Sequence, residues 1–310
     1  MNESVDVPEL SVVIVAYNER RTIEGCLASL ERQQTHRPFE VILIDSSGDG
    51  TDAVARRFPF VRVQHFAARK YPGDARNAGL ASARGGIIAF LDADCLVESD
   101  WIDAVARAHH TRHLAVGSAI INGSPKSLVA WAYYFCEFNL WLPRRETREM
   151  AEMAGCGLSI KRRAFEQYGP FLSDTYCSDT AFHWRLARDG HKALFVPSVR
   201  VAHTVRYRVG GLLRHIAAHR RAFASVVVHE KKFSMPKRFA AALVTAFLPL
   251  LLVPIVAWRV TRSEHLLRPF LLALPIVLLG VLARAWGEFL GFATAKGRPA
   301  QPTPESCGTT

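Results

Sequence analysis

Short apolar runs alternate with longer helix-like stretches through the first third of the chain, and this alternation constrains the fold most strongly. The runs are rich in β-branched residues and cover residues 10–16, 41–45, 61–65 and 87–92. Stretches with helical spacing, such as 22–34 and 75–83, lie between them. Strands that alternate with helices build a mostly parallel sheet with helices on its faces. The sequence therefore predicts an α/β fold here.

Polar side chains stand where three of these runs end. Ligands of open parallel sheets bind beyond the carboxyl ends of the strands, so these residues belong together. They are Ala16-Tyr17-Asn18-Glu19, Asp45-Ser46-Ser47 and Asp92-Ala93-Asp94. A dinucleotide-binding oxidoreductase is excluded, because it requires G-x-G-x-x-G directly after the first strand.

Asp92 and Asp94 are the sharpest chemical signal. Two carboxylates one residue apart at a strand end present hard oxygen ligands to a divalent cation such as Mg²⁺ or Mn²⁺. Such a cation usually shares its remaining coordination sites with water and substrate phosphates. The alternative is a pair of solvated loop acids, because D-x-D occurs often by chance.

Four sequence blocks in order carry a family resemblance. They are Val12-Val13-Ile14-Val15-Ala16-Tyr17-Asn18-Glu19, then Val41-Ile42-Leu43-Ile44-Asp45 with Gly48-Asp49-Gly50-Thr51, then Gly73-Asp74-Ala75-Arg76-Asn77-Ala78-Gly79, then Phe90-Leu91-Asp92-Ala93-Asp94. This pattern resembles the inverting family 2 glycosyltransferases of the GT-A fold, over roughly residues 10–203.

The resemblance implies a site for a nucleotide sugar and its metal, Mn²⁺ or Mg²⁺. It assigns Asp45 to the uracil or guanine base and the ribose, Ala16, Tyr17 and Glu19 to the base pocket, Arg76 to the diphosphate side of the donor pocket, Asp92 to the ribose and metal shell, and Asp94 and His203 to the metal. For His203, a packed or solvated histidine at a strand end stays an open alternative.

Asp179 stands at the place of the family's Glu-Asp motif, and the resemblance implies that it is the general base for the acceptor hydroxyl. The sequence departs from the family at Ser178, where an acid is common. Without a neighbouring carboxylate, desolvation would have to raise the pKa of Asp179. The alternative is an acid stabilised at a helix N-terminus.

The C-terminal third is basic and then apolar. Residues 200–238 hold ten Lys or Arg and one acid, most of the chain's net charge of +11. Residues 211–229 predict an amphipathic helix with Arg214 and Arg221 opposite its apolar face, lying at a membrane surface or packing on its own domain. Residues 239–258 carry no charge and are long enough to span a bilayer. The second apolar segment, residues 269–283, reaches that length only if Arg284 and Glu288 are buried as well, and these two residues can pair because they are four positions apart.

This arrangement predicts four parts: a GT-A domain over 1–205, a basic interfacial region over 206–238, a hydrophobic helical hairpin over 239–296, and a disordered tail over 297–310. Whether the hairpin spans the bilayer or is re-entrant stays open. The basic region favours anionic lipid over nucleic acid, because it carries no nucleic-acid recognition motif. The scattered cysteines are interpreted as packing residues in a reducing compartment, with the catalytic domain on the cytoplasmic side of the membrane.

The predicted protein is a membrane-associated, metal-dependent inverting glycosyltransferase. Its donor is a UDP- or GDP-sugar, and its acceptor is a membrane-proximal or lipid-linked glycan, with polyprenyl phosphate as one variant. The alternative is a catalytically silent membrane scaffold that keeps the GT-A fold, for which Ser178 is the sequence indication.

Overall fold

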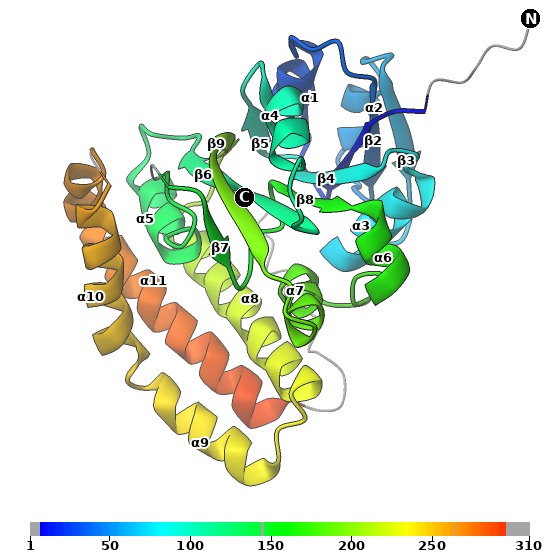
Figure 1. Cartoon of the computed structure of the whole chain (residues 1–310). Coiled ribbons are helices and arrows are strands. Elements are labelled where there is room, and N and C mark those ends of the chain that lie inside the picture. Colours follow the sequence, from blue (N-terminus) through cyan, green and yellow to red (C-terminus); the bar gives the residue numbers. More distant parts are fainter. Residues whose placement is uncertain (1–6, 144–145, 264, 296–310) are drawn as a thin grey trace, which may run out of the picture. The chain divides into compact units, whose positions relative to one another are not determined.

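The computed structural model describes residues 7–143, 146–263 and 265–295 and divides into two compact units (Figure 1). The first unit contains the sheet, and the second is helical. The units are not contiguous in sequence: residues Asn122–Leu142 and Asp174–Cys177 group with the C-terminal part, Val205–Thr310. The predicted tail, 297–310, lies outside the described residues.

The first half of the sheet is parallel. Its strands are β1 (Leu10–Ala16), β2 (Phe39–Asp45), β3 (Val61–His65) and β4 (Ile87–Asp92), in the spatial order β3-β2-β1-β4, and the helices of this half are α1 (Ile23–Glu31), α2 (Thr51–Ala55) and α3 (Pro72–Ser82). The register pairs Ala16 with Asp45 and Val15 with Asp92. The carboxyl ends that the sequence singled out therefore lie at one edge.

The second half of the sheet is antiparallel. It comprises β5 (Cys95–Val97), β6 (Ala115–Asn122), β7 (Arg148–Met150), β8 (Leu158–Lys161) and β9 (Ala193–His203), with α4 (Trp101–Ala108), α6 (Arg162–Tyr168) and α7 (Ser178–Arg188). Beyond β4 the order is β8-β6-β9-β5, and β7 pairs with β9. The predicted mostly parallel sheet is thus a mixed sheet. The sequence prediction came from β1 to β4, where helical crossovers favour parallel pairing.

Close packing of α3 on β1 holds the parallel half together. Val12, Val13 and Ile14 of β1 have no exposed surface. A Cβ added to Gly79 of α3 would stand 2.2 Å from Val13 Cγ1, so only glycine permits this approach. The apolar runs that predicted these strands are therefore the core of the first unit.

The described residues of the second unit form five helices. They are α5 (Leu128–Glu137), α8 (Val209–Glu230), α9 (Met235–Thr245), α10 (Leu248–Thr261) and α11 (Leu267–Thr294). Two glycines of α11 meet the backbone of α8: a Cβ at Gly287 would lie 2.2 Å from the Ala217 oxygen, and one at Gly291 2.5 Å from the Arg221 oxygen. The aromatic stretch that includes α5 also contributes to this core, where the rings of Phe135 and Phe270 meet edge to face at 5.3 Å.

The predicted amphipathic helix over 211–229 exists as α8, and its apolar face packs within the protein. Leu212, Ile216 and Val226 are buried, and α8 lies alongside α11, while Arg214 and Arg221 are exposed. Of the two alternatives for this face, the structure shows packing on its own domain. The predicted pairing of Arg284 with Glu288 is confirmed by a 3.0 Å contact between Nε and Oε1.

The two apolar segments differ from expectation in length. Residues 239–258 do not form one straight span, because α9 and α10 bend by 60° at their break. Pro249 follows the first residue of α10, and proline fits a helix start but disfavours helical conformation in the residue before it. Of the described helices, α11 alone is long and apolar enough to cross a membrane by itself.

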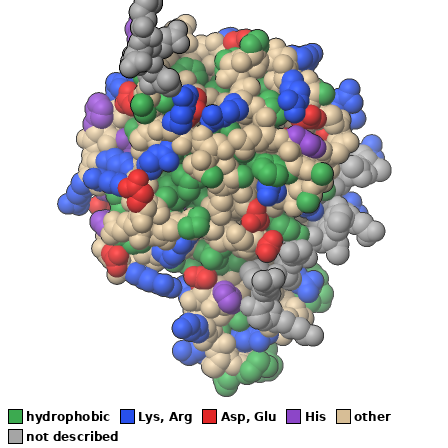
Figure 2. Space-filling model, turned by 90° about the vertical axis from the view of Figure 1, so that its right-hand side faces the viewer, with side chains coloured by type: hydrophobic (Ala, Val, Ile, Leu, Met, Phe, Trp, Pro, Cys, Tyr) green, Lys and Arg blue, Asp and Glu red, His purple; other side chains and the backbone are tan. Residues whose placement is uncertain are grey.

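Exposed apolar side chains concentrate in the second unit. All but three of the exposed large hydrophobic residues described lie between Met235 and Phe289. In Figure 2, hydrophobic side chains (green) and Lys or Arg side chains (blue) lie side by side at the lowest part of the view, at the end of the helical unit that contains α9. This mixture is typical of surfaces that contact lipid headgroups.

Candidate functional site

Asp92, Asp94 and His203 come together at the carboxyl edge of the sheet. Asp92 ends β4, Asp94 lies in the turn to β5, and His203 ends β9. The Nε2 atom of His203 is 3.3 Å from Oδ2 of Asp94, and one ligand atom from each of the three residues lies within 4.8 Å of the others. The structure thus gathers residues that are more than a hundred positions apart in the sequence.

Strand pairing fixes this geometry. The amide of Ala93 donates to the carbonyl oxygen of Val15, which ties the turn to β1. Thr204 donates to the carbonyl oxygen of Asp94 through both its amide, at 2.9 Å, and its hydroxyl, at 2.7 Å. The end of β9 is therefore held against the turn that carries Asp94.

Three carboxylates, those of Glu19, Asp92 and Asp94, lie close enough at this edge to repel one another. Burial and the nearby Asp94 carboxylate raise the pKa of Glu19 to about 8. Burial and Asp92 likewise raise the pKa of Asp94. Burial lowers the pKa of His203, which favours the neutral imidazole that binds metals. Two carboxylates and a neutral imidazole match the donor set of a divalent cation, whose charge would relieve the repulsion.

Arg76 provides positive charge beside Asp92. Its Nη2 atom is 3.4 Å from Oδ1 of Asp92, and the residue is only 4% exposed. A Cβ added to Gly155 would lie 2.4 Å from the same Nη2, so the loop before β8 packs directly on the guanidinium. Arg76 thus lies in the donor-side region that the sequence predicted, as a buried partner of Asp92.

Asp45 is fully buried and bonded on both oxygens. Its Oδ1 accepts from the Ser47 amide and hydroxyl, and Oδ2 is 2.6 Å from Nδ1 of His65. His65, about one third exposed, is therefore the accessible member of this group. Sequence reasoning missed His65, although it ends the third predicted strand and so had the same positional signal as Asp45.

The loops after β1 and β2 are bonded into one wall. The amide of Asn18, a residue with φ of +59°, donates to Ser47 Oγ at 2.7 Å, and the Gly48 amide donates to Asn18 Oδ1. The Glu19 amide donates to Thr51 Oγ1 at 3.0 Å. Ala16, buried, and Tyr17, half-buried, precede this wall.

Arg69 is a second residue that sequence reasoning missed. Its guanidinium carbon lies 4.1 Å from the centre of the Tyr17 ring and 5.2 Å from that of Tyr71. A cation this close to two aromatic rings is attracted to both and brings positive charge to these loops. No motif marks it, because its contact with Tyr17 joins two loops that only the fold brings together.

Asp179 lies in the first turn of α7, away from direct contact with the other predicted residues. In the described part of the chain it makes no hydrogen bond and no ion pair, and it is half-buried. Ser178, beside it, is fully buried and faces α3: a Cβ at Gly73 would stand 2.9 Å from its Oγ. Ser178 is therefore packed closely against α3, at the position where the family pattern favours an acid.

Comparison with known proteins identifies the family. The model of glycosyl transferase family 2 matches residues 11–169, just over half of the chain. The chain belongs to glycosyltransferase family 2.

Among the relatives of this family 2 glycosyltransferase is the glycosyltransferase AglE of Haloferax volcanii, 28% identical over 210 residues that cover 64% of this chain and 68% of the relative. The uncharacterized glycosyltransferase YfnE of Bacillus subtilis is 35% identical over 184 residues, 56% of this chain. Those residues cover 44% of YfnE, so the chain spans less than half of that relative.

Solved structures confirm the predicted GT-A fold. A mannosyltransferase from Pyrobaculum calidifontis, solved with GDP-Man and Mn²⁺, matches with a TM-score of 0.59 at 21% identity, over 91% of this chain and 87% of that one. Residues 1–349 of TarS from S. aureus, solved with UDP-GlcNAc, match with a TM-score of 0.54 at 16% identity, over 90% of each chain. The family 2 enzyme therefore has the fold that its first four strands predicted.

Proposed function

We propose that the chain transfers a sugar from a UDP- or GDP-sugar to a membrane-proximal or lipid-linked acceptor, with inversion at the anomeric carbon. The observation that carries the proposal is the convergence of Asp92, Asp94 and His203 at the carboxyl edge of the sheet. Membership of family 2 supports transfer of a sugar, and the two structural neighbours described above hold nucleotide sugars.

Asp94 and His203 would hold Mn²⁺ or Mg²⁺, with Asp92 facing both the ion and the ribose. When bound, the cation would neutralise charge on the leaving nucleoside diphosphate. Arg76 would fix the orientation of the Asp92 carboxylate through their 3.4 Å contact and keep positive charge on the diphosphate side. The excess of carboxylates at this edge supports the assignment, because they repel one another without a cation.

The nucleoside would lie against Ala16, Tyr17 and Glu19, at and just before the hydrogen-bonded loops that follow β1 and β2. Asp45 would act on the base through the side chains that it holds, Ser47 and His65, because its own carboxylate has no exposed surface. Two hydrogen bonds, from the Asn18 amide to Ser47 Oγ and from the Gly48 amide to Asn18 Oδ1, hold the two loops together. They support a pocket that is formed before the donor binds.

Asp179 would be the general base. Its carboxylate has no hydrogen-bond donor among the described residues, which leaves its oxygens available to accept the proton of an acceptor hydroxyl. The deprotonated oxygen would attack the anomeric carbon as the bond to the nucleoside diphosphate breaks, which inverts the configuration. The alternative, a silent scaffold, keeps the fold and lacks both steps.

The second unit would place the enzyme at a membrane. Its support is the 28-residue helix α11 together with the exposed apolar side chains of α9, α10 and α11. An active domain attached this way, on the cytoplasmic side, would meet acceptors carried by lipids. Polyprenyl phosphate is the simplest acceptor of this kind.

Thermal unfolding of the detergent-purified chain tests donor and metal together. A ligand at about 100 times its Kd adds about 2.7 kcal/mol, which raises the melting temperature measurably. We expect that one of the UDP-, GDP-, TDP- and CMP-sugars stabilises the chain when Mn²⁺ is present. This stabilisation should disappear when a chelator replaces Mn²⁺, and also in the Asp94→Asn variant. Asp100→Asn, an exposed acid of the same unit, should keep it. Absence of a shift with every donor would support the scaffold instead.

A further inference from the structure

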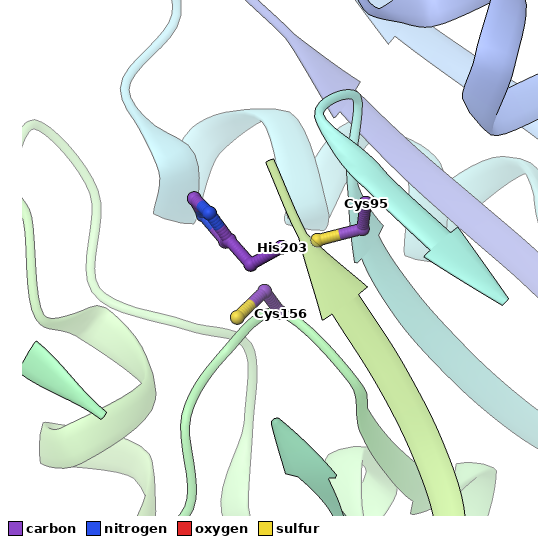
Figure 3. A group of neighbouring side chains, drawn as sticks. All are labelled: Cys95, Cys156 and His203. Atoms are coloured by element: carbon purple, nitrogen blue, oxygen red, sulfur yellow. The ribbon is translucent and has the colours of Figure 1, made fainter. Parts of the chain in front are cut away.

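Two cysteines and His203 form a second cluster of metal-binding side chains beside the carboxylates. Cys95, Cys156 and His203 each offer one ligand atom, and these atoms all lie within 4.8 Å of one another. Figure 3 shows that the three side chains come from β5, from the turn before β8 and from the end of β9. All three are buried, with at most 7% of each residue exposed.

The fold holds these three residues in place. Cys95 and His203 are paired partners in the antiparallel β5–β9 ladder, which puts both side chains on the same face. Cys156 is positioned by Gly157, whose amide donates to the Phe90 oxygen and whose φ of +102° suits only glycine. Strand pairing and the backbone at Gly157 therefore hold the three side chains close together.

The chemistry of this cluster differs from that of the carboxylates. Thiolate sulfur and imidazole nitrogen are the ligands of Zn²⁺, which binds them in a tetrahedron with distances of about 2.3 Å to sulfur and about 2.0 Å to nitrogen. In such a tetrahedron, neighbouring ligand atoms lie roughly 3.4 to 3.8 Å apart, so small side-chain movements suffice to form it. Mg²⁺ and Mn²⁺ prefer oxygen and would leave the sulfurs unused.

A fourth ligand is already within reach. Oδ1 of Asp94 is 3.7 Å from Sγ of Cys95, and Oδ2 of the same carboxylate is 3.3 Å from Nε2 of His203. We propose that Cys95, Cys156, His203 and Asp94 form a Zn²⁺ site that competes with the site for the hard cation. Both thiols lose their protons to solvent as the ion binds, and the two thiolates balance its charge.

Competition follows from the shared residues. His203 and Asp94 belong to both ligand sets, so one ion on the cysteines removes two ligands from the other position. Zn²⁺ would thereby lower the affinity of the carboxylate edge for Mn²⁺. The Zn²⁺ site rests on the cluster itself and not on glycosyl transfer.

Cobalt spectroscopy of the reduced, full-length protein tests the site directly. Co²⁺ bound by thiolates gives an intense charge-transfer absorption that oxygen ligands do not give. We expect saturation at one Co²⁺ per chain and bleaching by Zn²⁺. The absorption should be lost in Cys95→Ser and in Cys156→Ser. Cys177→Ser is the matched control, because Cys177 also faces a histidine, with 3.2 Å between its Sγ and Nε2 of His219.

Thiol labelling of the unaltered protein covers the case in which the serine variants do not fold. Zn²⁺ should slow alkylation of Cys95 and Cys156, measured peptide by peptide by mass spectrometry, and leave Cys177 unaffected. The proposal is overturned if no charge-transfer absorption forms, if Cys177→Ser removes it, or if both serine variants keep it. A Cys95–Cys156 disulfide in protein purified without reductant, with no metal binding after reduction, also overturns it.

Discussion

At the scale of single residues, what a side chain does at this site depends on its neighbours more than on its type. Asp45, Asp94 and Asp179 all follow or begin regular elements, yet their surroundings differ. Asp45 is sealed by Ser47 and His65, Asp94 crowds against other acids, and Asp179 meets no donor among the described residues. The roles proposed for the three aspartates, which are positioning, cation binding and proton acceptance, follow these differences in surroundings.

Asp179→Asn separates the base from the donor site. Asparagine keeps the shape but cannot take a proton, so we expect transfer to fall by about 100- to 10,000-fold. Donor-induced stabilisation should stay unchanged, because in the described part of the chain Asp179 makes no hydrogen bond and no ion pair with the proposed donor residues. Initial rates and thermal shifts measured on the same preparation give both quantities. Asp189→Asn, an exposed acid just beyond the end of α7, is the control; normal transfer by Asp179→Asn would identify another base.

At the scale of elements, α8 is attached to α11 by close backbone contact and to α5 by a buried ionic cluster around Glu137. Oε2 of Glu137 is 3.0 Å from Nη2 of Arg220 and 3.3 Å from Nδ1 of His219. Glycine at positions 287 and 291 permits the helices to approach, which buries these charges together. The apolar face of α8 is consequently covered by protein.

Gly287→Ala tests the helix contact. The new Cβ would lie 2.2 Å from the Ala217 carbonyl oxygen, and a backbone atom cannot move aside cheaply. We expect a loss of about 1–3 kcal/mol of stability, larger than the roughly 1 kcal/mol that alanine adds to a helix. Gly210→Ala, which meets nothing within 4 Å, should be neutral or stabilising. Denaturation followed by circular dichroism compares the two, and equal stability would contradict the close approach.

The Glu137 cluster predicts a pH dependence of stability. Burial alone would raise the pKa of Glu137, but Arg220 and His219 hold it well below its ordinary value of 4.5. Burial alone would lower the pKa of His219, but Cys177 and Glu137 raise it to about 10.

The two shifts act on opposite sides of neutrality. Because the pKa of Glu137 is lowered on folding, its contribution to the stability of the fold is complete above about pH 4.5 and is lost in acid. Because the pKa of His219 is raised on folding, its contribution is complete below about pH 6.5 and is lost as the pH rises toward 10. Glu137→Gln, which leaves Arg220 without its carboxylate, should cost about 3–5 kcal/mol between these values and less on either side. Melting temperatures of both proteins across this range check it; a pH-independent difference would contradict the ionic account.

At the scale of the whole molecule, the chain divides into a sheet unit and a helical unit that are interleaved in sequence. Residues 122–142 and 174–177 interrupt the sequence of the sheet unit and group with the C-terminal helices. Exposed large apolar side chains are concentrated on those helices and are rare on the sheet unit. This uneven distribution is the basis for the proposal that the helical unit contacts lipid.

Flotation on anionic liposomes tests that surface. We expect the chain to float with the vesicles and to stay bound in about 1 M salt, where charge alone is screened within about 3 Å. Phe239→Ser with Phe247→Ser, at 68% and 60% exposure, should weaken binding without unfolding the protein. Phe60→Ser, an exposed phenylalanine of the sheet unit, should have no effect. Release of the unaltered chain by salt would show purely electrostatic attachment.

The sequence by itself determined the local and periodic features of this protein. Strands at 10–16, 61–65 and 87–92 agree with β1, β3 and β4 residue for residue. For β1 and β4 the reason is burial on both faces of the sheet, which requires continuous apolar runs. The D-x-D pair, the family and the i, i+4 pairing of Arg284 with Glu288 also follow from local spacing.

Only the tertiary structure decided which distant residues meet. The antiparallel pairing of β5 with β9 brings Cys95 beside His203, and no periodicity in the sequence encodes that pairing. The sequence also did not determine that Asp45 is buried or that α11 covers α8, because both depend on surfaces that other elements supply. Local patterns record what a segment prefers, while contacts over long separations are chosen by packing of the whole chain.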